Sequence, residues 1–281
     1  MKKYKSNTRV RLSLFIKRFI YNLKKENETG IATHLYNEQS TLFHVSNKSY
    51  IEKQILNHQN HSGYLLDVMS QFLKPNKIFI DVGANIGSIS IPLAKFYQSK
   101  GTEFHLFEPN PSIYKRLKSN INLNGLSNIV VNQIGLSSSS GKSEFYIPSP
   151  ESFNQGTSSF SKNVDIENLK QVQVNISTLD EYIVSKNIKA EDVCLIKLDV
   201  QGHEYKVLEG AQNLLSNNRC TILLEYETIY DSADFNYSKN MRDMLLNNNY
   251  IIYKINRFNP DFLEKVDTFS GASNYICIKK L

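Results

Sequence analysis

A chain of 281 residues is long enough for one large domain, or for one domain with an extension. The hydrophobic fraction of 41% supports a real core, and no apolar run approaches the roughly 20 residues that span a bilayer. The net charge is +6, but residues 1–25 hold nine Lys and Arg residues and no acid, so the other 256 residues carry a net charge of −3. A nearly neutral body argues against a nucleic-acid-binding surface. The three widely spaced cysteines fit neither a metal site nor a disulfide framework, which is typical of a reducing compartment.

Residues 1–25 predict a basic amphipathic helix. Apolar side chains recur at helical spacing from Leu12 to Leu23, and basic residues occupy the other faces. Two interpretations stay open, namely docking on an anionic membrane surface and packing against protein, and the second is the commoner use of such a stripe. The short run Leu12–Ile16 is broken by Lys17 and Arg18 and has no cleavage site, so it is not a signal peptide. We therefore expect a cytoplasmic protein, with peripheral contact at the inner membrane face under the first interpretation.

Residues 1–60 are taken as a basic amphipathic helical N-terminal extension, and residues 61–281 as the main domain. Within the extension, residues 41–45 resemble a short strand and residues 50–56 one or two helical turns. A helix is expected over residues 63–73, ending near Lys74 because Pro75 disfavours the helical conformation of the residue before it.

Strands and helices then alternate along the main domain. Near-continuous apolar runs predict core strands at residues 78–82, 103–107, 128–134, 193–200 and 221–226. Helical periodicity predicts helices at 88–97, 111–122, 204–215 and from 241, with a short helix capped by Thr178. Further strands are expected at 143–147 and 172–176, and the last two, 250–255 and 275–279, as an antiparallel pair at the sheet edge. This alternation predicts a mainly parallel sheet covered by helices on both faces.

A long loop is expected over residues 149–168, which are rich in Ser, Asn and Gly and show no periodicity. Loops of this length inside a domain are often binding loops, and Thr157, Ser158 and Ser159 could meet a ligand. A solvated loop with no such role is the equally weighted alternative.

Residues 77–87 indicate a buried strand that ends at Asp81 and continues through a glycine-containing loop into a helix. Open α/β sheets bind nucleotide-like cofactors at such a point. A dinucleotide site requires G-x-G-x-x-G and a P-loop requires Gly-Lys-Ser/Thr, and neither follows this strand. An acid before the loop suits a positively charged ligand such as S-adenosylmethionine. We therefore predict that Asp81, Gly83, Asn85 and Gly87 bind S-adenosylmethionine, the two glycines allowing close backbone approach.

Glu108 is the second candidate cofactor residue. It follows the next strand and lies 27 residues beyond Asp81. An acid at that position accepts hydrogen bonds from both ribose hydroxyls. The alternative is an acid in the first turn of the following helix, but the upstream glycine loop favours the ribose role.

A dense polar segment ends the strand at residues 193–200. Strand alternation puts Lys197, Asp199 and Gln201 on one side, and buried charge is costly unless it is paired. His203 and Glu204 follow at the start of a helix. Asp199 or His203 could accept the proton of an acceptor hydroxyl during methyl transfer.

A structural interpretation of the same segment is equally compatible with the sequence. Lys197 could pair with Asp199 or with Glu225, which ends the next strand, in an ion network that only stabilises the fold. His203 would then simply cap its helix. No spacing of His, Asp and Glu residues in this segment predicts a metal site.

Together the motifs at residues 81–87, 108–109, 177–180 and 197–204 resemble those of the FkbM family of S-adenosylmethionine-dependent methyltransferases. The similarity covers about residues 55–255. It implies an α/β class I methyltransferase (Rossmann-like) fold, with a mainly parallel seven-stranded sheet, helices on both faces and the last strand antiparallel. It also implies O-methylation of a hydroxyl on a sugar or a polyketide-type natural product. One departure is Gln201, where the family usually has Glu.

We therefore expect an S-adenosylmethionine-dependent O-methyltransferase that acts on a hydroxyl of a saccharide or related glycan or natural product. Asp81, Gly83, Asn85, Gly87 and Glu108 would bind the cofactor. The acceptor hydroxyl would be handled by Asp199 and His203, with Lys197 and Glu204 as orienting partners. An NAD-dependent oxidoreductase is the weaker enzymatic alternative, and a methyltransferase-like binding subunit without catalytic activity, which Gln201 favours, is the alternative outside enzymes.

Overall fold

The computed structural model describes residues 29–46, 50–56, 63–149, 157–160, 169–229, 231, 236–259 and 263–280. The predicted basic helix within residues 1–25 lies outside these ranges. None of the helices in the described part of the chain has the length and apolar content that crossing a bilayer requires.

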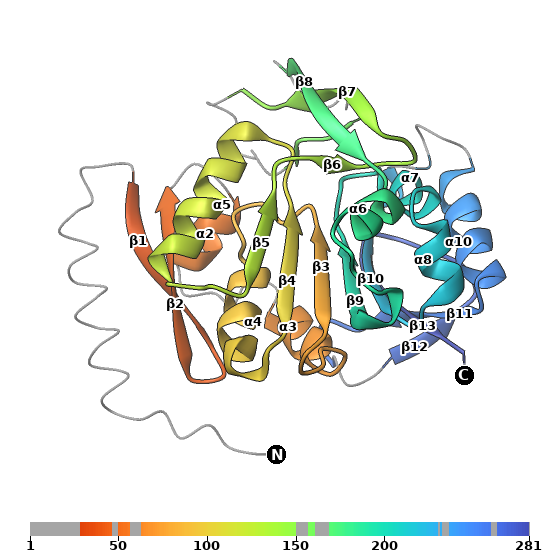
Figure 1. Cartoon of the computed structure of the whole chain (residues 1–281), viewed down its shortest axis with the longest axis horizontal. Coiled ribbons are helices and arrows are strands. Elements are labelled where there is room, and N and C mark those ends of the chain that lie inside the picture. The colour runs from red at the N-terminus through yellow and green to blue at the C-terminus, as the bar shows by residue number, and fades with distance from the viewer. Residues whose placement is uncertain are drawn as a thin grey trace.

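A mainly parallel sheet forms the centre of the molecule (Figure 1). Its strand order is β12-β11-β13-β10-β9-β3-β4-β5, in which β5, β4, β3, β9 and β10 run parallel. The parallel strands are β3 (Ile78–Val82), β4 (Glu103–Phe107), β5 (Ile129–Asn132), β9 (Val193–Leu198) and β10 (Thr221–Tyr226). The remaining strands are β11 (Tyr250–Ile255), β12 (Leu263–Val266) and β13 (Ser273–Lys279). The expected class I fold is confirmed, and β13 pairs antiparallel with β10.

Helices cover both faces of this sheet, one group on each side (Figure 1). One face packs on α2 (Tyr50–Leu56), α3 (Gly63–Ser70), α4 (Ser90–Tyr97) and α5 (Pro111–Leu123). The other packs on α6 (Leu179–Ser185), α7 (Glu204–Glu209), α8 (Gln212–Asn217) and α10 (Tyr237–Asn247). Single-turn helices at Gln98–Lys100 and Ala190–Asp192 precede β4 and β9. The buried hydrophobic residues divide accordingly into two clusters, one on each face of the sheet.

Two elements differ from the sequence predictions. The predicted antiparallel pair of β11 and β13 forms, but β13 lies inside the sheet and the additional strand β12 forms the edge. The helix expected over residues 204–215 is broken into α7 and α8 at Gly210. A Cβ atom at Gly210 would lie 2.0 Å from the carbonyl oxygen of Ser137, so the close approach of that segment requires glycine here.

The N-terminal part of the described chain is a β-hairpin rather than a helical extension. β1 (Thr29–Tyr36) and β2 (Gln39–Ser46) pair antiparallel, whereas the sequence pattern predicts only a short strand at 41–45. Asn37 and Glu38 form the two-residue loop with φ values of 44° and 65°, the left-handed conformation that matches the twist of a hairpin. The prediction of only a short strand is corrected because the turn at Asn37 and Glu38 pairs the whole of β1 with β2.

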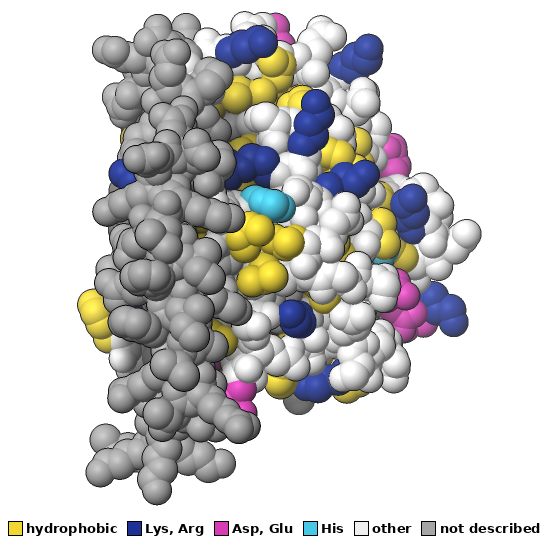
Figure 2. Space-filling view, turned by 90° about the vertical axis from the view of Figure 1, so that its left-hand side faces the viewer, with side chains coloured by type: hydrophobic (Ala, Val, Ile, Leu, Met, Phe, Trp, Pro, Cys, Tyr) yellow, Lys and Arg dark blue, Asp and Glu magenta, His cyan; other side chains and the backbone are white. Residues whose placement is uncertain are grey.

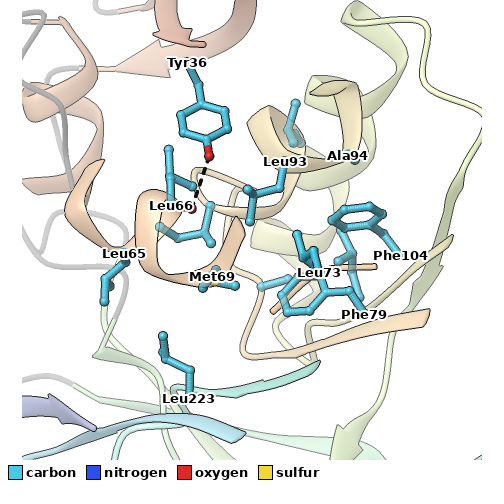
Figure 3. Packing of buried hydrophobic residues seen from close by; sticks show 14 of the residues in the cluster. Tyr36, Leu65, Leu66, Met69, Leu73, Phe79, Leu93, Ala94, Phe104 and Leu223 are labelled. Atoms are coloured by element: carbon cyan, nitrogen blue, oxygen red, sulfur yellow. Dashed lines mark hydrogen bonds between the residues drawn. The ribbon is translucent and has the colours of Figure 1, made fainter. Parts of the chain in front are cut away.

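The hairpin is anchored on the main domain. Backbone N–H groups of Leu42 and His44 donate to the side-chain oxygens of Asn124 and Asn120 on α5, over 2.9 and 2.8 Å. The ring of Tyr36 packs among α3 and α4, and its hydroxyl donates to the carbonyl of Leu66 over 3.2 Å (Figure 3). On the outer side, viewed in Figure 2, Lys and Arg side chains are scattered among uncharged ones. The side chains of the hairpin therefore belong to the same buried cluster as α3, α4 and the first face of the central sheet, so the packing continues across the domain boundary predicted at residue 60.

A small three-stranded sheet lies beyond the carboxyl ends of the parallel strands (Figure 1). It consists of β6 (Gly135–Leu136), β8 (Lys170–Ser177) and β7 (Gly141–Ile147), in that order. β6 follows β5 directly, and Thr178 after β8 caps α6 as predicted, accepting a hydrogen bond from the N–H of Glu181 over 3.0 Å. This sheet brings further residues to the end of the central sheet where the predicted site residues lie.

Candidate active site

The carboxyl ends of the parallel strands bring the candidate residues together on one face of the sheet. Residues two apart on a strand point to the same face. Asp81 follows Phe79, Lys197 follows Leu195 and Glu225 follows Leu223 at this spacing, and these three apolar residues belong to the same buried cluster. The predicted residues from β3 and β9 therefore meet, and Glu225 of β10 joins them.

Asp81 is the buried centre of this group, with 1% of its surface exposed. One carboxylate oxygen accepts a hydrogen bond from Ser90, in the first turn of α4, and the other accepts one from the ammonium group of Lys197 over 3.0 Å. Lys197 also reaches the carbonyl of Gly83 over 3.4 Å. Both oxygens of Asp81 are thus hydrogen-bonded inside the protein, and the carboxylate is shielded from solvent.

The loop after β3 is shaped by its contact with β9 as well as by glycine. Gly83 has φ +83°, and a Cβ atom there would lie 1.9 Å from the carbonyl oxygen of Asp199. Asn85 has φ 51°, a conformation that asparagine tolerates, and its side chain accepts from the N–H of Ile86 over 2.8 Å. Gly87 has φ +86°, and a Cβ atom there would collide with side chains of α4 and α5. The two glycines therefore allow close contacts within the protein, Gly83 with the end of β9 and Gly87 with α4 and α5, and the close approach to a cofactor stays a prediction.

Glu108 lies at the end of β4 and points to the loop after β3. Its two carboxylate oxygens accept hydrogen bonds from the N–H groups of Asn85 and Asn110, over 3.0 and 2.9 Å. The helix α5 is capped by the side chain of Asn110, which accepts from Ser112, so Glu108 is not the capping residue. Burial raises the pKa of Glu108 to about 7 in spite of these N–H groups. Each carboxylate oxygen still has a free lone pair for a ligand hydroxyl.

Asp199 is partly exposed, with 34% of its side chain open to solvent, whereas Asp81 and Glu108 are buried. It accepts a hydrogen bond from the side-chain amide of Gln201 over 3.1 Å and lies 3.4 Å from the ammonium group of Lys197. Burial acts to raise the pKa of Asp199, but this effect is outweighed by the charge of Lys197 and by the hydrogen bonds from Glu225 and Gln201, so the pKa is lowered. Asp199 is therefore ionised and open to a ligand.

Lys197 joins the two aspartates electrostatically. Burial acts to lower the pKa of Lys197, but the charges of Asp81 and Asp199 outweigh it and raise the pKa, so the ammonium group stays charged. Two carboxylates facing one ammonium group leave a net negative charge beside the glycine loop. This supports the electrostatic part of the predicted cofactor site.

His203 is held in a different setting from Asp199. Its Nε2 atom lies 2.9 Å from the hydroxyl of Ser137, and its ring lies against that of Phe160 with centroids 4.4 Å apart. Burial, followed by the charge of Lys206, lowers the pKa of His203 to about 4. His203 is therefore neutral near pH 7 and a weak base.

Glu204 supports the turn between β9 and α7. One carboxylate oxygen accepts from the N–H groups of Val200 and Gly202, over 2.9 and 3.4 Å, and the other accepts from the hydroxyl of Tyr237. Only 1% of its surface is exposed, and burial raises its pKa. Glu204 thus orients the segment that carries Asp199, as an orienting partner would, and does not face a ligand.

Residues 157–160 contact both the segment after β4, next to Glu108, and the segment after β9, at His203. The hydroxyl of Ser158 accepts from the side-chain amide of Asn110 over 3.1 Å, next to Glu108. Ser159 pairs with Tyr146 of β7, and Phe160 packs on Phe145 and His203. Ser158 and Ser159 are among the predicted ligand-contacting residues, but Phe160 is not. A loop without periodicity gives no signal for its contacts with Phe145 and His203.

Comparison with known proteins identifies the family to which the chain belongs. The model of the methyltransferase FkbM domain matches residues 81–252. The hexuronic acid methyltransferase AglP of Haloferax volcanii is 35% identical over 139 residues, which cover 49% of this chain and 51% of AglP, so the match spans about half of that relative. Methyltransferase sdnD of Sordaria araneosa is 30% identical over 189 residues, covering 58% of this chain and 70% of sdnD.

Solved structures also resemble the chain at low sequence identity. The methyltransferase FkbM from Methylobacillus flagellatus is 13% identical with a TM-score of 0.42, covering 81% of this chain and 52% of that one. TYW2 of M. jannaschii, solved in complex with AdoMet, is 16% identical with a TM-score of 0.43, covering 89% of this chain and 84% of that one. The matched model includes every residue predicted from the sequence to bind cofactor or acceptor, and the chain belongs to the FkbM methyltransferase family.

Proposed function

We propose that this protein is a cytoplasmic S-adenosylmethionine-dependent O-methyltransferase that methylates a hydroxyl group of a saccharide. The observation that carries the proposal is the group of Asp81, Lys197 and Asp199 beside Glu108, at the carboxyl ends of β3, β9 and β4. The family match supports methyl transfer, and the residues of this group supply the chemistry that a positively charged methyl donor requires.

The chain's residues suit S-adenosylmethionine in two respects. The net negative charge of Asp81 and Asp199 around Lys197 attracts a ligand with a sulfonium and an ammonium group. Glu108 keeps acceptor capacity for two ribose hydroxyls, because each of its oxygens receives only one N–H group from the protein. When bound, the cofactor would supply a methyl group on a positively charged sulfur.

Asp199 is the residue proposed to act on the acceptor. The cofactor would supply the methyl group and would keep the electron pair of its sulfur–carbon bond, so the protein must take up the proton that the acceptor hydroxyl loses. The hydroxyl proton then passes to the carboxylate of Asp199, which is ionised and partly exposed. Lys197 and Gln201 hold that carboxylate in position.

A hexuronic acid is the first acceptor class to test, because the relative AglP is named a hexuronic acid methyltransferase. The chain has a matching cation at the same edge of the sheet. Arg257 follows β11, which runs parallel to β10, and its charge contributes to the pKa of Tyr64. Tyr64 in turn accepts a hydrogen bond from Asn274, which is paired with Glu225. Phe258, 90% exposed beside Arg257, offers an aromatic face for a sugar ring.

The function is tested by titration and by methyl transfer. Calorimetric titration should detect binding of S-adenosylmethionine and no comparable binding of NADH. Incubation with S-adenosylmethionine labelled in its methyl group should then label glucuronic acid or a glycan fraction of cell extract. Tight binding of NADH alone would replace the proposal with the oxidoreductase, and cofactor binding without transfer to any fraction would favour a non-catalytic subunit.

The affinity for S-adenosylmethionine should rise with pH around neutrality through Glu108. Because the pKa of Glu108 is about 7 in the free protein and its ionised form accepts two ribose hydroxyls better than the neutral acid does, binding below this pH favours release of a proton. The dissociation constant should therefore fall by up to about tenfold per pH unit from pH 6 to 7 and level off above pH 8.

The matched control for this titration is Glu108→Gln, which keeps the size of the side chain and cannot ionise. Its affinity should be weaker at pH 8 and should lack the part of the pH dependence that Glu108 causes. Calorimetry of both proteins at several pH values separates this effect from the titration of the cofactor itself. Identical pH profiles of the two proteins would exclude the ribose role of Glu108.

Residues 1–25, which lie outside the described residues, have a separate test. Their basic amphipathic pattern leads to the expectation that deletion reduces binding to vesicles containing anionic lipid and leaves S-adenosylmethionine affinity intact. Cosedimentation with vesicles and calorimetric titration measure the two properties. A loss of cofactor affinity would instead show that the segment packs on the domain.

A further inference from the structure

Two carboxyl groups lie side by side at the carboxyl ends of β9 and β10. The strands pair in parallel, with Leu198 beside Leu224, so the next residues, Asp199 and Glu225, are neighbours. The two carboxyl groups are close enough for each to shift the pKa of the other, by charge and by a hydrogen bond between them. Two ionised carboxylates would repel and neither would carry a hydrogen to donate, so the contact is favourable when one of the two acids holds a proton.

The surrounding charges decide which of the two acids holds the proton. The ammonium group of Lys197 lies 3.4 Å from Asp199, and the amide of Gln201 donates to the same carboxylate, so both stabilise the charge on Asp199. Glu225 is paired across the sheet with Asn274, whose amide donates to Tyr64, and Glu227, just after the end of β10, is the next acid along the chain. Glu225 is therefore the protonated partner.

The pKa shifts of Glu225 and Asp199 have the directions that a protonated Glu225 and an ionised Asp199 require. The charge of Asp199, and then burial, raises the pKa of Glu225 to about 9, with Glu227 adding to the shift and Lys197 opposing it. The pKa of Asp199 is lowered, because Lys197 and its hydrogen bonds outweigh burial. Asp81 is linked to this pair through Lys197, which donates a hydrogen bond to it. Burial raises the pKa of the neighbouring Glu204, and the charge of Asp199 adds to this shift.

We propose that Glu225 is a positioning residue that, as a neutral carboxylic acid, donates a hydrogen bond to Asp199 and so orients it as the ionised acceptor of the substrate's hydroxyl proton. This inference rests on the proposed function of Asp199. It assigns a role to a residue that the sequence motif of β9 does not include, and it explains how an acid on β10 contributes to the reaction without touching the substrate.

Gln201 fits the same arrangement. The family usually has Glu at this position, and a carboxylate there would be the third beside Asp199 and Glu225. The amide of Gln201 instead donates to Asp199 over 3.1 Å, so it adds a second neutral donor to the same carboxylate. Gln201→Glu should therefore raise the pKa of Asp199 and move the acidic limb of the activity profile to higher pH.

Carboxyl ¹³C NMR of protein labelled at glutamate and aspartate tests the proton directly and needs no acceptor. The resonance of Glu225, assigned by its absence in Glu225→Gln, should titrate near pH 9, and that of Asp199 below the range of an exposed aspartate. Glu227→Gln is the matched control, since it removes a neighbouring acid that does not contact Asp199. Titration of Glu225 in the ordinary range of an exposed glutamate would overturn the proposal.

The activity profile tests the positioning role, with methyl transfer measured to glucuronic acid or to the labelled extract fraction. The wild type should lose activity above about pH 9, where deprotonation of Glu225 puts two negative charges together, and Glu227→Gln should keep this alkaline limb at a somewhat lower pH, because the charge of Glu227 adds to the pKa of Glu225. Glu225→Gln, which keeps a donor to Asp199 without a titratable proton, should retain most activity and lack this alkaline limb. Glu225→Ala should lower kcat by about tenfold or more across the range.

The outcomes separate this inference from the proposed function. An unchanged alkaline limb in Glu225→Gln, or an active Glu225→Ala, would exclude the positioning role while methyl transfer itself stands. Binding of S-adenosylmethionine without transfer to any acceptor would exclude the proposed function, and with it the role proposed for Glu225, although the NMR titration would still report which acid holds the proton.

Discussion

Asp199→Asn is expected to lower kcat for methyl transfer by about 10² to 10⁴ fold, the usual contribution of a positioned proton acceptor. Asparagine has the size of aspartate and can still accept from Gln201, so the turn after β9 should keep its shape. What the variant removes is the only partly exposed carboxylate among Asp81, Asp199 and Glu204, since the other two are each 1% exposed. No other acid of that group can reach the acceptor.

The same experiment distinguishes Asp199 from His203. The Nε2 atom of His203 already faces Ser137 over 2.9 Å and its ring lies against Phe160, so it is less free than the partly exposed carboxylate of Asp199 to take the hydroxyl proton. We expect His203→Ala to reduce kcat less than Asp199→Asn does, with an effect through the packing of Phe160. The acceptor identified by labelling serves as the substrate for both variants.

Cofactor binding is the control for these variants. The dissociation constant of S-adenosylmethionine, measured by calorimetry, should rise in Asp199→Asn because the group around Lys197 loses its net negative charge, but by less than kcat falls, because Glu108 remains in place. If Asp199→Asn and His203→Ala both retained full methyl transfer, the acceptor site assigned here would be wrong. If His203→Ala alone abolished transfer, the proton would pass to His203 rather than to Asp199.

Most of the central sheet and the meeting of the β3 and β9 motifs could be predicted from the sequence. The apolar runs of β3, β4, β9 and β10 are long enough to identify buried parallel strands, and the carboxyl ends of such strands meet at one edge. Alternation along each strand then places Asp81 and Lys197 on the same face. These inferences need only local patterns and the geometry of a parallel sheet.

The parts that the sequence did not predict depend on contacts between distant segments. Tyr237 of α10 donates to Glu204, and Phe160 packs on His203 from a loop without periodicity. The hairpin β1–β2 depends on a turn of Asn37 and Glu38, which lacks the Asn-Gly signature that would have revealed it. The pairing of Glu225 with Asp199 required the register of β10 against β9, which no single-strand pattern contains.

Lys197→Met should destabilise the protein by about 3–5 kcal/mol, the usual cost of leaving one partner of a buried ion pair uncompensated. The ammonium group of Lys197 binds Asp81 over 3.0 Å, and Asp81 would keep only Ser90 as a partner while staying 1% exposed. At roughly 2–4 °C per kcal/mol for a chain of this size, the unfolding temperature should fall by roughly 6–20 °C. Calorimetry of thermal unfolding measures this change.

Lys77→Met is the matched control, because Lys77 and Asp192 form a second ion pair, over 2.7 Å, between the residues that precede β3 and β9. Side chains that are 33% and 36% exposed are screened by water, so this variant should unfold near the temperature of the wild type. The double variant Lys197→Met with Asp81→Asn should recover part of the lost stability, since the buried carboxylate that lost its partner is then gone. Equal losses for Lys77→Met and Lys197→Met would contradict the argument, because burial is the property in which the two pairs differ most.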